Sequence, residues 1–170
     1  MSNIEKLRKI IPEGVDCVLV TSEIHQRYLT GFPFTDGYVV VGRDHAWLLT
    51  DFRYIEAAKT HETSELTVSM FDNRRVSLGN LFADNGFKNV GYEDDFLICA
   101  DLDRLKELYP DVCFVKAGGL ISGLRTVKEP WEVENIVRAQ RIAEKSLERL
   151  LSLITPDMPE REVALELDFG

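Results

Sequence analysis

Short apolar runs rich in β-branched residues alternate with helical patterns over residues 16–116, and this alternation constrains the fold most strongly. Strands are predicted at residues 16–22, 37–42, 45–50, 66–71, 88–93 and 112–117. Helices are predicted between them, at residues 23–30, 51–61, 76–86 and 100–110. Strands that alternate with helices predict an α/β domain. The polar turn Gly42-Arg43-Asp44 joins two of the strands as a hairpin, so we expect a mixed sheet rather than an all-parallel one.

Polar and glycine residues mark the predicted helix ends. Ser22 is placed to cap the helix at residues 23–30, and Gly31 suits the left-handed conformation that ends a helix. Asp51 is placed to cap the helix at residues 51–61. Asn85 and Gly86 close the helix before them.

The character of the chain changes at about residue 124. Pro130 starts a periodic pattern that predicts one helix over residues 130–154, with a broad apolar face that must lie against something. The preceding "GGLISG" (residues 118–123) lacks the lysine of a P-loop and the spacing of a dinucleotide turn, so we interpret it as an interdomain connection. We expect two domains, at residues 1–123 and 124–170. The second has the pattern of a truncated domain, because its last helix reaches residue 170 without a closing cap.

The bulk properties exclude several classes of protein. A net charge of −9 argues against a surface for nucleic-acid phosphates, which needs clustered Lys and Arg. No apolar run reaches the length of a membrane span, and the N-terminus has no signal-peptide core. Cys17, Cys99 and Cys113 lie in apolar contexts without metal or redox spacing, which predicts buried, reduced thiols. We therefore expect a cytoplasmic protein without a membrane or nucleic-acid partner.

The loop in "YLTGFPFTDG" is the first candidate site. Phe32, Phe34 and Asp36 would form either a binding lip or an ordinary connection packed on its own aromatics. Arg53 and Tyr54 follow a strand directly, at the predicted start of a helix. Arg53 would bind a carboxylate or an interface, or else form an internal ion pair with Asp51 or the Glu93 region.

Two further groups of residues favour a structural interpretation. The carboxylates of "YEDDF" (residues 92–96) are expected in a solvated turn, although paired carboxylates also perform acid–base chemistry or bind cations. His25, His45 and His61 are too widely spaced to predict a metal site, and His25 is expected on a helix surface.

Several segments together resemble one known family. The segments "VLVTS", "YLTGF", "GYVVV" and "AWLLTDFRYIEAA", in this order, resemble the N-terminal domain of the creatinase/prolidase/aminopeptidase P family. "LRTVKEPWEVENIVRAQRIAEKSLERLL" is similar to the connection and first helix of that family's second domain, and "MPEREVALELDFG" to the segment that follows. The resemblance implies a mixed sheet with a ribonuclease H-like motif and helices on both faces, followed by a long helix of a truncated second domain.

The resemblance also implies a function. Family members cleave Xaa-Pro peptides or hydrolyse creatine with two divalent ions, often Mn, Co or Zn, which activate a bridging water and polarise the carbonyl. Their two Asp, one His and two Glu ligands belong to a catalytic domain that corresponds to none of the residues here. We therefore expect an inactive N-terminal domain of a cytoplasmic Xaa-Pro aminopeptidase or dipeptidase, with its own catalytic domain and a homodimer mate as partners and proline-containing peptides as substrates of the parent enzyme.

By the same resemblance, Phe32, Phe34, Asp36, Arg53 and Tyr54 would form a lip over the substrate cleft, with no catalytic or metal-binding residue in this chain. Two alternatives stay open. The first is a stand-alone binding or assembly module without peptidase activity. The second is a fragment of a creatinase-like amidinohydrolase, which shares the architecture but acts on another substrate.

Overall fold

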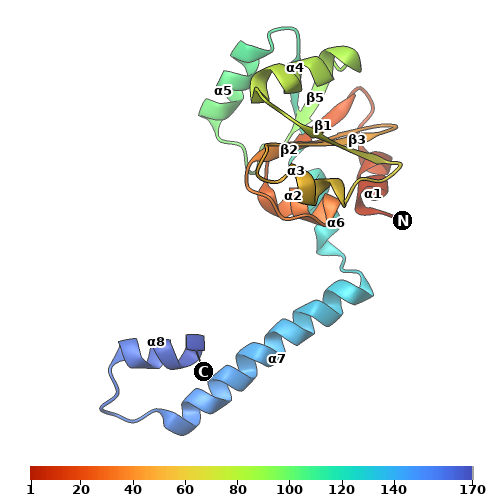
Figure 1. Cartoon of the computed structure of the whole chain (residues 1–170). Coiled ribbons are helices and arrows are strands. Elements are labelled where there is room, and N and C mark those ends of the chain that lie inside the picture. Colours follow the sequence, from red (N-terminus) through yellow and green to blue (C-terminus); the bar gives the residue numbers. More distant parts are fainter. Residues whose placement is uncertain (170) are drawn as a thin grey trace. The chain divides into compact units, whose positions relative to one another are not determined.

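A computed structural model describes residues 1–169 of the chain. The chain divides into two compact units, Met1–Thr126 and Val127–Gly170 (Figure 1). The first unit carries the sheet and most of the helices. The second consists of two helices joined by a short loop.

Six strands form one mixed sheet in the first unit. They are β1 (Cys17–Val20), β2 (Gly37–Gly42), β3 (Ala46–Thr50), β4 (Leu66–Met70), β5 (Asn89–Tyr92) and β6 (Cys113–Lys116). Their order in the sheet is β4-β3-β2-β1-β5-β6. Strand β2 runs antiparallel to β1 and β3, and the other neighbours are parallel. The predicted hairpin and the mixed sheet are therefore confirmed.

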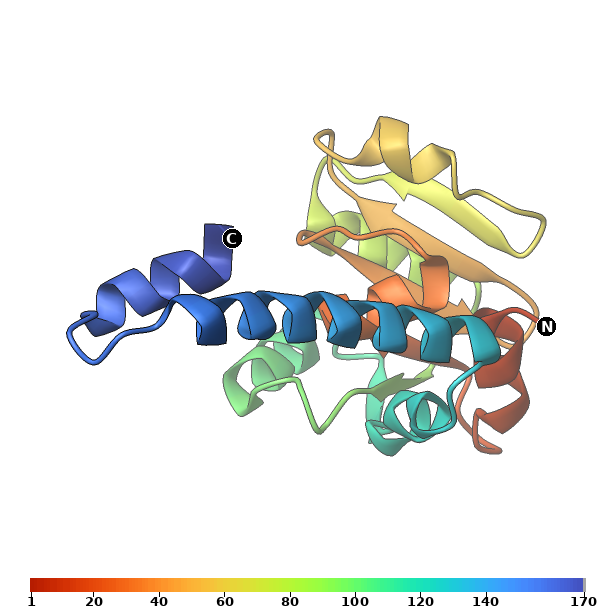
Figure 2. The same ribbon diagram turned by 90° about the horizontal axis from the view of Figure 1, so that it is seen from below.

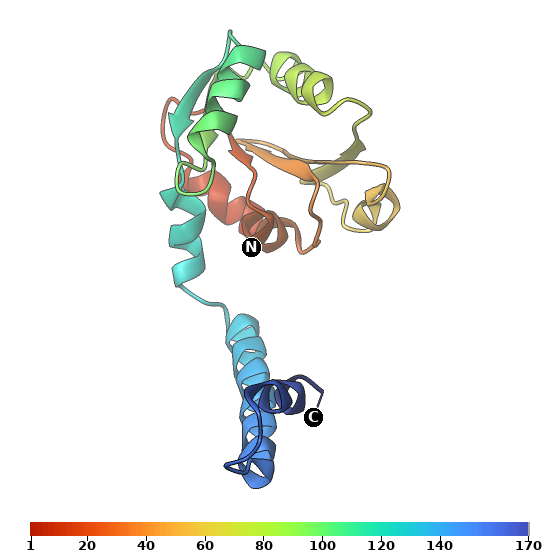
Figure 3. The ribbon, with the colours of Figure 1, turned by 90° about the vertical axis from the view of Figure 1, so that its left-hand side faces the viewer.

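Helices cover both faces of this sheet, as predicted (Figure 3). The helices of the first unit are α1 (Asn3–Ile10), α2 (Glu23–Thr30), α3 (Ile55–Lys59), α4 (Arg74–Asp84), α5 (Cys99–Leu108) and α6 (Gly119–Thr126). Side chains of α1, α2, α3 and α6 pack on one face of the sheet, and those of α4 and α5 pack on the other. Alternate residues of each strand point to opposite faces, so the fully buried run Cys17–Val20 contributes to both cores.

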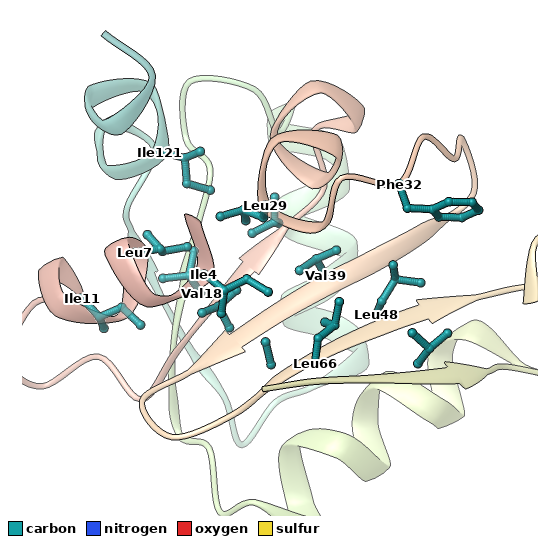
Figure 4. Packing of buried hydrophobic residues seen from close by; sticks show 14 of the residues in the cluster. Ile4, Leu7, Ile11, Val18, Leu29, Phe32, Val39, Leu48, Leu66 and Ile121 are labelled. Atoms are coloured by element: carbon teal, nitrogen blue, oxygen red, sulfur yellow. The ribbon is translucent and has the colours of Figure 1, made fainter. Parts of the chain in front are cut away.

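The core on the face of α1 and α2 joins residues far apart in sequence. Leu7, Leu29 and Ile121 come from three helices and pack over Val18 and Val39 of the sheet (Figure 4). The glycines of residues 118–123 disfavour a helix. The Ile121 side chain is only 1% exposed, and its burial in the core stabilises the helix that forms there. The segment "GGLISG" was predicted as an interdomain connection, but Gly119–Gly123 belong to α6, inside the first unit.

Two predicted helix starts also need correction. Helix α3 begins only at Ile55, and residues 51–54 form a turn in which the Asp51 side chain accepts a bond from the Arg53 N–H at 2.9 Å. The Asp51 carboxylate thus stabilises the turn instead of capping a helix. Ser22 does occupy the cap position of α2, but its side chain makes no cap hydrogen bond. Gly31 ends α2 in the left-handed conformation (φ 72°), as predicted.

The cysteines are only partly as predicted. Cys17 is buried in the central strand, and burial raises the pKa of its thiol well above the usual range. Cys99 and Cys113 are exposed, because they lie at the first residue of α5 and of the edge strand β6. All three are free thiols.

The second unit contains the predicted long helix, α7 (Pro130–Leu153), which begins with Pro130 and a capping box between Glu129 and Glu132. Helix α8 (Glu160–Phe169) folds back beside it, with an ion pair of 2.5 Å between Arg149 and Glu166 (Figure 2). Most apolar side chains of both helices are exposed within this unit. No helix among residues 1–169 is both long and apolar enough to span a bilayer.

Candidate functional site

One edge of the sheet collects most of the polar side chains that sequence reasoning singled out. Strand β2 is antiparallel to both its neighbours, so the other five strands all run the same way and their carboxyl ends share this edge. Because β2 runs in the opposite direction, it begins at this edge, and the loop that leads into β2 also reaches it. In open α/β sheets, ligands bind outside the carboxyl ends of the strands. This edge is therefore where a site is expected.

The loop of residues 31–37 is fixed to the core by its aromatic side chains. The rings of Phe32 and Phe34 stack with their centroids 5.8 Å apart, and both side chains are buried. Phe32 also contacts the rings of Tyr54 and His61, at 6.4 Å and 5.1 Å. The two phenylalanines thus support the loop from beneath, and the loop presents its polar residues to solvent.

The exposed part of the loop forms a network of ion pairs. The Asp36 carboxylate accepts hydrogen bonds from Arg53 Nη2 at 2.5 Å and from Arg74 Nη2 at 2.9 Å. Arg53 also donates to Asp51 Oδ2, from Nε at 2.9 Å and from Nη2 at 2.5 Å. These contacts confirm the predicted ion pair with Asp51, whereas Glu93 is no partner of Arg53. The guanidinium groups lower the pKa values of Asp36 and Asp51, and the two carboxylates raise the pKa of Arg53.

Aromatic rings hold this network in place. The Arg53 guanidinium lies 5.5 Å from the centre of the Tyr54 ring, and the Tyr54 hydroxyl is 2.9 Å from the hydroxyl of Thr35 in the loop. The Arg74 guanidinium lies over the rings of Tyr38 and Phe71, at 5.7 Å and 5.3 Å. Cation–π contacts of this kind position an arginine without neutralising its charge.

The five residues predicted for the site are therefore joined by direct contacts, which run from Phe34 through Phe32, Tyr54 and Arg53 to Asp36. Sequence reasoning missed Arg74, which enters from the first turn of α4. The signal was present, because "NRR" (residues 73–75) follows a predicted strand and should lie at the same edge.

The acidic segment "YEDDF" is not a solvated turn, and that prediction is wrong for Glu93. Its side chain is fully buried, and Oε2 accepts bonds from the backbone N–H groups of Thr21 at 2.6 Å and Ser22 at 2.8 Å. Oε1 is 2.5 Å from Nδ1 of His25, which is also buried rather than on a helix surface. Glu93 thus satisfies the backbone N–H groups of Thr21 and Ser22, the two residues that directly precede α2.

The two carboxylates after Glu93 fix a different helix. Asp94 accepts a bond from the Gly118 N–H at 2.9 Å, which lowers the pKa of Asp94. Asp95 accepts a bond from the Ser122 hydroxyl of α6 at 3.0 Å. The acidic segment therefore joins β5 to α2 and α6, and its role in this unit is structural.

The described residues do not provide a metal centre. Residues 1–169 contain no group of three or more His, Cys, Asp or Glu side chains arranged to hold an ion. The carboxylates at the sheet edge are instead bound by arginines, backbone N–H groups and a serine hydroxyl. No side chain described here is assigned to a dinuclear site.

Comparison with known proteins shows to which family this chain belongs. The model of the creatinase/prolidase N-terminal domain matches residues 3–127. An Xaa-Pro dipeptidase from Bacillus anthracis superposes with a TM-score of 0.90 and 32% identity, over 98% of this chain and 47% of that one. The uncharacterized peptidase YqhT of Bacillus subtilis is 28% identical, over 98% of this chain and 47% of its own length. The N-terminal domain of the cytoplasmic peptidase PepQ from Mycobacterium tuberculosis, at 28% identity and a TM-score of 0.62, covers 71% of this chain and 96% of that one.

These matches agree on the part of the relatives that is present here. The chain spans about half the length of the longer relatives, and the matching family model describes an N-terminal domain. The chain belongs to the creatinase/prolidase N-terminal domain family.

Proposed function

We propose that the chain is the non-catalytic N-terminal part of a cytoplasmic Xaa-Pro aminopeptidase or dipeptidase. The observation that carries this proposal is the match of 98% of the chain to 47% of an Xaa-Pro dipeptidase at a TM-score of 0.90. The catalytic centre, with two divalent ions that activate water and polarise the scissile carbonyl, would belong to sequence outside these residues. The 170-residue chain alone is then inactive. In the parent enzyme it contributes contacts of a homodimer.

Within that enzyme the loop of residues 31–37 acts as a lip over the substrate cleft. The burial of Phe32 and Phe34 supports this role, since it holds the loop in one position. Asp36 is able to bind the free amine of a peptide, and Arg53 a carboxylate, because both side chains are partly exposed. The Tyr54 hydroxyl fixes the same loop through Thr35.

The first experiment reads the encoding gene past codon 170. The expected result is an open frame that supplies two Asp, one His and two Glu in a further domain. The complete protein should then hydrolyse Xaa-Pro dipeptides or longer Xaa-Pro peptides with Mn²⁺, Co²⁺ or Zn²⁺, and lose activity in a chelator. Creatine as a parallel substrate distinguishes the amidinohydrolase. A stop codon directly after Gly170 would rule out the peptidase role for this polypeptide and favour a stand-alone binding module.

The lip is tested by Asp36→Asn in the complete enzyme. We expect KM for an Xaa-Pro peptide to rise about fivefold, the scale of one solvent-exposed ion pair, with kcat little changed. The matched control is Asp44→Asn, which makes the same change in the exposed turn at the opposite edge of the sheet. Equal kinetic effects of the two substitutions would contradict the assignment of Asp36.

A further inference from the structure

A cleft beside the arginine network is lined by residues of α4 and α5, two helices that pack on the same face of the sheet. Its volume is about 580 Å³, within the range of about 300–1,000 Å³ that is usual for small-molecule sites. Thr21, which follows the last residue of β1, and Gly37, the first residue of β2, both line the cleft, so it lies at the carboxyl edge of the sheet. The order of strands changes direction next to β1, because β2, β3 and β4 lie on one side and β5 and β6 on the other. Ligands favour such a switch point.

The side chains that line the cleft carry a net positive charge. Three arginines line it, Arg74 and Arg75 from α4 and Arg104 from α5, and the one acidic lining residue is Asp101. Asp101 and Arg104 are 3.8 Å apart. The Arg75 guanidinium makes no ion pair or hydrogen bond with any residue in the described range 1–169. A positive cleft in a chain of net charge −9 concentrates anions locally.

The rest of the cleft wall is aromatic and aliphatic. Tyr38 and Tyr109 lie on the side of α4, and Phe96, Ile98 and Leu105 lie on the side of α5. Phe96 and Ile98 are more than half exposed. Their apolar surface is therefore accessible to a ligand in the same cleft as the guanidinium groups. Tyr109 donates its hydroxyl to the Arg75 carbonyl at 2.9 Å, and burial raises the pKa of Tyr109 to about 12. Its phenol therefore stays neutral and adds no negative charge to the cleft.

We propose that this cleft binds a small organic anion, a carboxylate attached to an aromatic or aliphatic body. The carboxylate would accept paired hydrogen bonds from the Arg75 guanidinium, with Arg104 close by, because the planar fork of arginine matches a carboxylate. The body would lie on the apolar wall formed by Phe96, Ile98 and Leu105. The inference does not rest on the peptidase assignment, since every residue it uses lies in the first unit.

Arg74 connects the cleft with the loop of residues 31–37. It lines the cleft, and its guanidinium donates to Asp36 at 2.9 Å. The Asp36 carboxylate neutralises part of the positive charge that Arg74 adds to the cleft wall, and so weakens its attraction for a carboxylate bound at Arg75. Removal of the Asp36 charge should therefore strengthen binding in the cleft, an effect opposite in sign to that of removing an arginine.

The test uses the 170-residue chain labelled with ¹⁵N and three probes, 3-phenylpropionate, its neutral amide and acetate. We expect 3-phenylpropionate to shift the backbone amide signals of Gly37, Tyr38 and Leu105 until they saturate. The neutral amide probe lacks the charge-assisted contact, and acetate lacks the apolar body. Each should therefore bind at least about tenfold more weakly than 3-phenylpropionate. Arg75→Met should weaken 3-phenylpropionate about tenfold for the same reason. Asp36→Asn should strengthen it.

The matched control is Arg138→Met, which removes an exposed guanidinium from α7 and should leave the affinity unchanged. Arg104→Met is the second cleft variant, in case Arg75→Met alters the fold. Equal affinities for the acid and the amide would overturn the proposal. Shifts confined to residues outside the cleft, or affinities that neither cleft variant changes, would overturn it as well.

Discussion

Replacement of Glu93 by alanine should destabilise the first unit far more than loss of an ordinary surface carboxylate. The side chain of Glu93 is fully buried and accepts the N–H groups of Thr21 and Ser22 and a contact from His25. A buried donor left without a partner costs about 1–3 kcal/mol. Two such N–H groups and the imidazole predict a loss of about 4 kcal/mol for Glu93→Ala, a large part of the ~5–15 kcal/mol that stabilises a typical domain.

Glu93→Gln separates the charge of this side chain from its shape. The glutamine oxygen is able to accept both backbone N–H bonds, and its amide group is able to donate to His25. Only the charge assistance is lost, so we expect a loss of about 1–2 kcal/mol. The two variants together measure how much of the stabilisation comes from the presence of an acceptor and how much from its charge.

Urea unfolding followed by Trp47 fluorescence measures both losses. The chain has two tryptophans, so a Trp131→Phe background leaves Trp47 of β3 to report on the first unit alone. Glu107→Ala, an exposed carboxylate on α5, is the matched control and should change the midpoint little. The reasoning fails if Glu93→Ala costs less than about 1 kcal/mol, or if alanine is no worse than glutamine at this position.

Two further predictions concern a close packing contact and the thiols. Gly118→Ala should destabilise the first unit by about 2 kcal/mol through overpacking, because a Cβ there would lie 2.3 Å from Asp95 Oδ1 and 2.9 Å from the Asp95 backbone nitrogen. Gly123→Ala in α6 meets no atom within 4 Å and serves as the control; similar melting temperatures of the two variants would refute the contact. In the native protein a thiol-reactive disulfide reagent should modify two cysteines rapidly and Cys17 only after unfolding, because burial raises the pKa of that thiol. Rapid modification of all three would show that the central strand opens.

The sequence alone was sufficient for features whose signals are local. Alternation of β-branched and helical patterns predicted the six strands and the mixed α/β class, and Pro130 predicted where α7 begins. Gly31 predicted the end of α2 correctly, because a helix terminus depends mainly on the conformations that the few residues around it can adopt. The five residues predicted for the site lie next to one another, in a chain of ring and ion contacts that runs from Phe34 to Asp36.

Tertiary structure decided what depends on neighbours distant in sequence. Strand order places Arg74 against Asp36 across 38 positions, so the contact between these two residues cannot be predicted from either segment alone. The same applies to Glu93. It is the first of three consecutive acidic residues, a pattern that suggests solvent exposure. The pairing of β5 with β1, however, places Glu93 next to the N–H groups that precede α2. Helix α6 forms over a glycine-rich segment because burial of Ile121 outweighs weak helix propensity. Local patterns determined the elements of this protein, whereas contacts between them determined which polar groups are buried and which remain open to a ligand.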